Sequence, residues 1–143
     1  MGKNAIRSAP LAMQEKLNQL LEKHCVTIKN NVELLGAYLK RAREEDDLLQ
    51  ALNDAAALAH QLKGSSGTAG FHDICVAATA LNGHLSELTA RGEAHSHQDL
   101  QRVIELYDKL SSVSQAAHPQ SSALYFMAQP LPNERASKQN TAG

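Results

Sequence analysis

The sequence is poor in aromatic residues and contains no tryptophan. Aromatic side chains make up 3% of its 143 residues, so a packed interior has to be built mainly from Leu, Ala, Val and Ile. This composition suits packed helices better than a β-sheet, in which aromatic and β-branched residues are favoured. Apolar residues still reach 43%, which is enough for a core and excludes a chain that is disordered throughout. The length allows a single domain.

Cysteine, net charge and long apolar runs are also scarce. Cys25 and Cys75 both lie within apolar helical patterns, which predicts buried, reduced thiols in preference to a disulfide. Fourteen Lys and Arg residues nearly balance fifteen Asp and Glu, which removes any long-range attraction to nucleic acid or an anionic membrane. No apolar run has the length of a membrane-spanning helix or of a secretory signal. The sequence therefore predicts a cytoplasmic, monomeric protein with no nucleic-acid or membrane partner.

Apolar residues recur at helical spacing in four stretches of the chain. The first stretch begins near Pro10, which can open a helix, and either one long helix or two helices with a bend near His24 fit it. The apolar positions are Leu17, Leu20, Leu21, Ile28, Val32, Leu35 and Leu39, then Leu48, Leu52, Ala55, Ala59 and Leu62, then Ile74, Ala78, Leu81, Leu85 and Leu88, and last Leu100, Val103, Tyr107 and Leu110.

Local signals mark where these helices should begin and end. The second helix should end near Gly67 or Gly70 and the third at Gly92, because glycine can adopt the left-handed conformation of a helix C-terminus. Ser96 and Asp99 resemble a capping box at the start of the fourth. We predict an all-α protein, an antiparallel four-helix bundle with an additional N-terminal helix. The bundle is expected over residues 9–117, between a flexible N-terminus at 1–8 and a flexible C-terminal tail at 118–143.

One of the seven histidines has a distinctive neighbourhood. At 100° per residue, one face of the second helix holds Asn53, Ala56, Ala57, His60, Lys63, Gly64 and Gly67. The opposite arc holds Leu48, Ala51, Ala55, Leu58 and Leu62, which leaves His60 pointing to solvent among small neighbours. Glycine inside a helix costs roughly 0.5–1 kcal/mol relative to alanine, so Gly64 and Gly67 indicate that a shallow surface beside the histidine has a use.

This face suits chemistry on the imidazole of His60. Neutral imidazole is well populated near neutral pH and is a good nucleophile. Lys63 can place a positive charge near an anionic group on the ring, and the hydroxyl of Ser66 or Thr68 could add a hydrogen bond to a phosphoryl group. The shallow surface would let another protein bring its own reactive group close.

Plainer interpretations compete with this one. The other six histidines are best explained as solvated or packed side chains, and Gly67 could equally well end its helix. His95 and His97 have no third ligand nearby, so neither a metal site nor a cofactor is expected. The chain also lacks the convergent carboxylates of a hydrolytic enzyme.

The segment around His60 resembles the signature of histidine phosphotransfer (HPt) domains. Residues 59–71 read AHQLKGSSGTAGF, and the shared pattern is Ala-His-x-apolar-Lys-Gly-small-small followed by Gly-(Phe/Leu). A wider similarity of helix pattern covers roughly residues 17–115. The resemblance implies that His60 is the phosphorylation site, that Lys63 stabilises the phosphate, and that Gly64 is the position of close approach. Ala56, Ala57 and Gly67 are the further residues that we expect in the partner-binding face.

The resemblance implies a phosphorelay intermediate of a two-component system, which is a phosphocarrier and not an enzyme. The phosphoryl group would come from the phospho-aspartate of a receiver domain in a hybrid sensor kinase and pass to the aspartate of a response regulator. These receiver domains would be its partners and would supply the catalytic pocket and Mg²⁺. A non-catalytic helical adaptor that binds or sequesters receiver domains is the alternative, because a fold does not determine a function.

The following helix differs from one group of relatives. Residues 67–71 are also similar to the phospho-accepting domain of chemotaxis histidine kinases, which commonly place a glutamate on the next helix to orient the histidine. Asn82 occupies the matching position and could orient His60. An uncharged amide cannot raise the basicity of imidazole as a carboxylate does, which favours relay from a receiver over direct phosphorylation by a kinase domain.

Overall fold

The computed structural model describes residues 2–44, 48–92 and 96–127, and it describes side chains within 11–43, 48–92 and 96–125. The elements, in chain order, are α1 (Gly2–Glu44), α2 (Leu48–Thr68), α3 (His72–Arg91), α4 (His97–Gln115), the 3₁₀ turn η1 (Pro119–Ser121) and α5 (Ala123–Met127). The described part contains no strand. The all-α class predicted from the composition is therefore confirmed.

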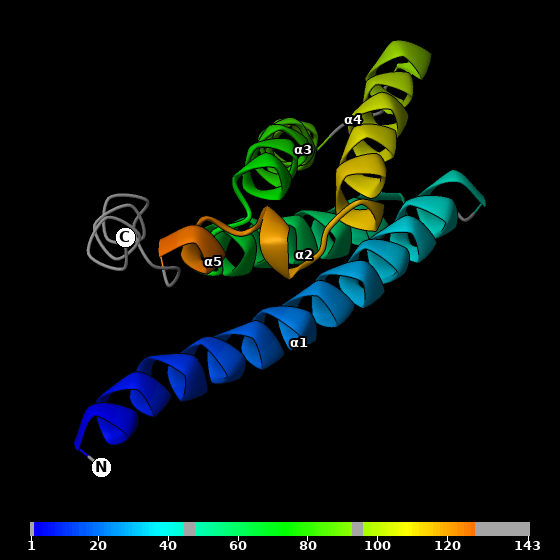
Figure 1. Ribbon diagram of the computed structural model, residues 1–143. Helices are drawn as coiled ribbons and strands as arrows, with labels where there is room; N and C mark the ends of the chain where they lie inside the picture. The colour runs from blue at the N-terminus through cyan, green and yellow to red at the C-terminus, as the bar shows by residue number, and fades with distance from the viewer. Residues whose placement is uncertain (1, 45–47, 93–95, 128–143) are drawn as a thin grey trace.

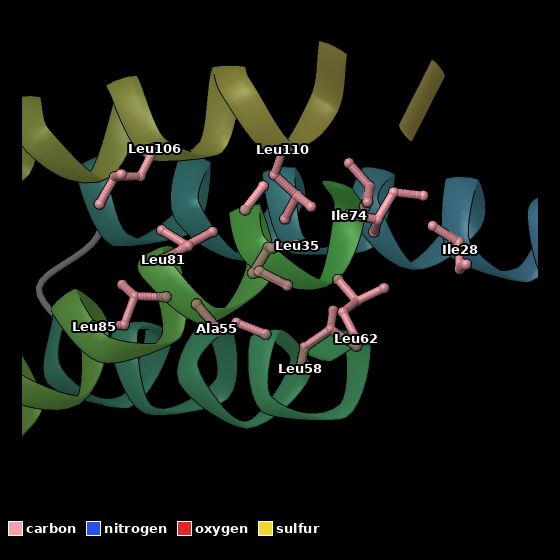
Figure 2. Packing of buried hydrophobic residues seen from close by; sticks show 14 of the residues in the cluster. Ile28, Leu35, Ala55, Leu58, Leu62, Ile74, Leu81, Leu85, Leu106 and Leu110 are labelled. Atoms are coloured by element: carbon pink, nitrogen blue, oxygen red, sulfur yellow. The ribbon is translucent and has the colours of Figure 1, made fainter. Parts of the chain in front are cut away.

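Four long helices enclose one hydrophobic core. α2 packs against α1 and α3, and α4 packs against α3 and α1 (Figure 1). Figure 2 shows apolar side chains from these helices meeting in the core, among them Leu35, Leu62, Leu81 and Leu110, which are all fully buried. Burying one such leucine contributes about 1.5–3 kcal/mol. Because α2 is covered by neighbours on two sides, only one face of it is left to solvent.

α1 is one unbroken helix of 43 residues. Of the two arrangements that the sequence leaves open, the structure has the single long helix, and the expected additional N-terminal helix is simply its first part. No glycine or proline interrupts residues 11–35, so nothing in this stretch breaks the helix. The backbone of residues 2–8 is helical where the sequence predicts a flexible lead.

No helix in the described part is long and apolar enough to cross a membrane.

The ends of α2, α3 and α4 follow the local signals. Gly70 has a positive φ of 81°, and the amides of Gly70 and Phe71 donate to the carbonyls of Gly67 and Ser66 at 3.2 and 2.8 Å. These two bonds are those of a Schellman motif. Gly92 ends α3 in the left-handed conformation. Both hydrogen bonds of the capping box at Ser96 are present.

The chain beyond α4 packs against the turn between α2 and α3. Ser122 is fully buried, and its hydroxyl donates to the carbonyl of Ala69 at 2.6 Å. The amide of Ala123 donates to the carbonyl of Gly70 at 2.9 Å. These groups satisfy carbonyls at the end of α2, within the stretch from residue 118 that the sequence predicts to be a flexible tail. Residues 128–143 lie outside the described part.

α1 and α4 approach closely at Gly36. The hydroxyl of Tyr107 donates to the carbonyl of Val32 at 3.1 Å, and its ring lies over Gly36. Burial raises the pKa of Tyr107, and Asp108 and Glu33 add to the rise, so the hydroxyl keeps its proton. A Cβ at Gly36 would overlap the hydroxyl oxygen of Tyr107.

A Gly36→Ala substitution should therefore displace Tyr107 and lower the free energy of unfolding by about 1–2 kcal/mol, despite the better helix propensity of alanine. The matched control is Gly83→Ala, because none of the segments that the structure describes comes within 4 Å of a Cβ at that helical glycine. There we expect a gain of roughly 0.5–1 kcal/mol. Urea unfolding measures both values. Equal effects of the two substitutions would contradict the role given to Tyr107.

Candidate functional site

His60 lies on the exposed face of α2, past the middle of the helix. Its neighbours Leu58, Ala59 and Leu62 are all buried and fix the orientation of α2 against the core. Since buried positions follow the 3.6-residue period, the imidazole at position 60 projects from the opposite side. The exposure predicted from the helical pattern is therefore confirmed.

The surface beside His60 is formed by small residues and carries a cation, Lys63. Lys63 is half-buried one turn further along α2, and Gly64 is exposed. Among the described residues, no atom beyond the local backbone of α2 lies within 4 Å of a Cβ placed at Gly64, so helix packing does not require glycine there and the space above it is open. One turn before the histidine, Ala57 is exposed and Ala56 is half-buried. A partner can approach this side of the imidazole without meeting a long side chain.

Gly67 has a different surrounding. A Cβ at Gly67 would lie 3.3 Å from the Sγ of Cys75 on α3, which is a tight contact. The Cys75 thiol in turn donates to the carbonyl of Lys63 at 3.5 Å. The packing of α2 on α3 thus gives its own reason for glycine at position 67, and a partner-binding role there stays a prediction.

The prediction that the hydroxyl of Ser66 could bind a phosphoryl group on His60 is wrong. Ser66 is fully buried, and its Oγ donates to the carbonyl of Leu62 at 2.6 Å. It therefore cannot reach a phosphoryl group on His60 without leaving the core. Thr68 is exposed.

Cys75 is a residue of this region that sequence reasoning missed. It is half-buried, not buried as expected, whereas Cys25 is buried and burial raises the pKa of its thiol. Both are free thiols. The short connection between α2 and α3 makes the two helices antiparallel, and this could have indicated that Cys75 lies opposite Lys63 and Gly67.

Asn82 lies two turns along α3 from Cys75 and is half-buried. Because Cys75 contacts α2 near Lys63, the antiparallel register brings Asn82 near the level of His60. Within the described residues, no hydrogen bond joins Asn82 to His60. An orienting role of Asn82 therefore stays a prediction.

The site holds a nucleophile and a cation but no cluster of ligands. In residues 2–44, 48–92 and 96–127, no group of three or more His, Cys, Asp and Glu side chains could hold a metal ion. The face can therefore present an imidazole to another protein and counter negative charge through Lys63.

Comparison with known proteins identifies the family. A family model described as "Hpt domain" matches residues 12–116, from α1 to the end of α4. No curated protein and no solved structure matched the chain. The matched range contains all the candidate site residues and covers well over half of the sequence. The chain belongs to the Hpt domain family.

Proposed function

We propose that this protein is a phosphorelay intermediate that carries a phosphoryl group on His60. Its family supports a histidine phosphotransfer role in phosphorelays, as a phosphocarrier that works with receiver domains. The observation that carries the proposal is the exposed imidazole of His60 beside Lys63 and the open space at Gly64. A helix held by a buried opposite face points that imidazole toward solvent.

The transfer is a substitution at phosphorus. The lone pair of one ring nitrogen of His60 attacks the phosphorus of a receiver's phospho-aspartate, and an N–P bond forms. The bond from phosphorus to the aspartyl oxygen breaks, and the carboxylate leaves with the electron pair. Charge in such a transition state spreads over three phosphoryl oxygens, where the ammonium of Lys63 can stabilise it. The reverse steps deliver the group to the aspartate of a second receiver.

The partners would be the receiver domains of a hybrid sensor kinase and of a response regulator. Phosphorus and nitrogen must come within bonding reach, so the two protein surfaces have to meet closely around His60. Ala56, Ala57 and Gly64 keep that surface low. The receiver would supply the catalytic pocket and Mg²⁺.

Label transfer from a phosphorylated receiver domain tests the proposal. We expect ³²P to move from the receiver to this protein and to be labile to acid but stable to base, as an N–P bond is. The adaptor alternative predicts a complex in which the receiver keeps its label. Binding without transfer would therefore contradict the carrier function and support the adaptor function.

Replacing Lys63 with alanine should slow this transfer about tenfold, which corresponds to about 1.4 kcal/mol of lost charge stabilisation. Stability should change little, because Lys63 is only half-buried. The measurement is the single-turnover rate of label transfer. Lys63→Arg should retain most of the rate, and Lys109→Ala on the exposed side of α4 should have no effect. An unchanged rate and an unchanged phosphohistidine lifetime in Lys63→Ala would contradict the phosphate-stabilising role of Lys63.

A further inference from the structure

Two leucines of α1 are exposed on the side that borders α2. Leu20 is 51% exposed and Leu34 is 43% exposed, although the sequence pattern places Leu20 in the buried stripe. Fourteen residues separate them, which is close to four helical turns. They therefore lie along the same flank of the helix.

The flank of α1 that bears these leucines borders two grooves, which are walled on the other side by α2. Leu20 lies on the first groove and Leu34 on the second, and Asn31 and Gln61 line both. Because they share these two residues, the grooves adjoin along the α1–α2 interface, and we call the pair the α1–α2 trough. α1 and α2 lie side by side along it in Figure 1.

The trough is continuous with the face around His60. Its α2 wall includes Ala57, which is also part of that face, and Gln61, which directly follows His60. On the helix, Gln61 is turned 100° from His60 and Ala57 only 60°. A partner that covers His60 therefore reaches the trough without crossing another helix.

A partner of ordinary size must extend beyond α2. A typical interface buries about 800 Å² on each side, which is more than one exposed helix face offers. α1 provides two large apolar side chains next to hollows, the kind of feature that anchors an interface. α3 provides Val76, which is 50% exposed but borders neither groove of the trough.

The charges of the trough suit an acidic partner. Lys23 lines it, and Lys63 lies on the far side of His60. The carboxylate of Asp54 accepts hydrogen bonds from Arg41 and then Gln50, which together hold its pKa below the usual value. The negative charge of Asp54 is thus already paired within the protein. A domain that bears a phospho-aspartate and binds Mg²⁺ through carboxylates is acidic at its reactive edge.

From this continuity and charge we infer that the receiver domain that exchanges a phosphoryl group with His60 docks over the α1–α2 trough, with Leu20 and Leu34 as its apolar anchors. This inference rests on the proposed function and names the residues that set the affinity for the partner.

Substitution of the anchors tests the inference. Leu20→Asp and Leu34→Asp should each weaken binding of the receiver that donates fastest in the transfer assay about tenfold or more, measured by titration calorimetry. Val26→Asp is the matched control, because Val26 is 59% exposed on α1 but borders neither groove. It should leave the affinity within about twofold of wild type. Circular dichroism and thermal unfolding verify that each variant is folded.

A small phosphoryl donor separates failure of this inference from failure of the proposed function. Phosphoramidate needs no docking surface, so Leu20→Asp and Leu34→Asp should take up its phosphoryl group on His60 as the wild type does. Unchanged receiver affinity in both leucine variants, with loss in Val76→Asp, would move the docking surface to α3 and overturn the inference alone. A wild-type protein that accepts no group from either donor would overturn both.

Discussion

Replacing His60 with glutamine should abolish uptake of the phosphoryl group from a phosphorylated receiver domain. The lone pair of an amide nitrogen is delocalised into its carbonyl, so glutamine has no nucleophile to replace the ring nitrogen. His60 is exposed and its side chain fills no part of the core, so the free energy of unfolding should stay within about 0.5 kcal/mol of wild type. The rate of label transfer and a urea titration measure the two quantities separately.

The control for this substitution is another exposed histidine. His72 lies at the start of α3, outside the face around His60, and His72→Gln should transfer label at the wild-type rate. Acid-labile label that persists in His60→Gln would place the phosphoryl group on a different residue. Loss of label in both variants would point to a general effect on the fold, which the urea titration would reveal.

Features set by neighbours in sequence could be predicted. Gly92 ends α3 and Ser96 caps α4, because each depends on groups within one helical turn. The exposure of His60 could be predicted in the same way, because the apolar arc on the other side of α2 is a local pattern. The candidate site therefore follows largely from residues 48–68.

Features set by distant contacts could not be predicted. Ser122 is a small polar residue in a segment without helical period. It is buried because its hydroxyl donates to the carbonyl of Ala69, while the next amide, that of Ala123, donates to the carbonyl of Gly70. Leu20 fits the apolar period of α1, yet its side chain is 51% exposed at the edge of the groove between α1 and α2. In each case the missing information is what another part of the chain covers or leaves open.

The contact between Gly70 and the C-terminal segment makes Gly70→Ala the substitution with the largest expected effect on stability. A positive φ costs a residue other than glycine about 1–2 kcal/mol. A Cβ at Gly70 would also lie 2.7 Å from the Oγ of Ser122 and 3.1–3.2 Å from the amide nitrogens of Leu124 and Ala123. Rotation of a side chain could relieve only the first of these contacts, because the other two involve backbone. The segment would have to move away and leave the carbonyls of Ala69 and Gly70 without their partners.

We therefore expect Gly70→Ala to lower the free energy of unfolding by about 3–4 kcal/mol in urea, the conformational cost together with the lost bonds. Gly92→Ala is the matched control, because Gly92 also has a positive φ but no other part of the described chain lies within 4 Å of its Cβ position. It should lose only about 1–2 kcal/mol. Hydrogen exchange at the amide of Ala123 should accelerate in Gly70→Ala and stay slow in Gly92→Ala, since only the first displaces the segment. Equal losses of stability and equal exchange in the two variants would show that the contact with Ser122 and Ala123 does not hold the C-terminal segment on the bundle.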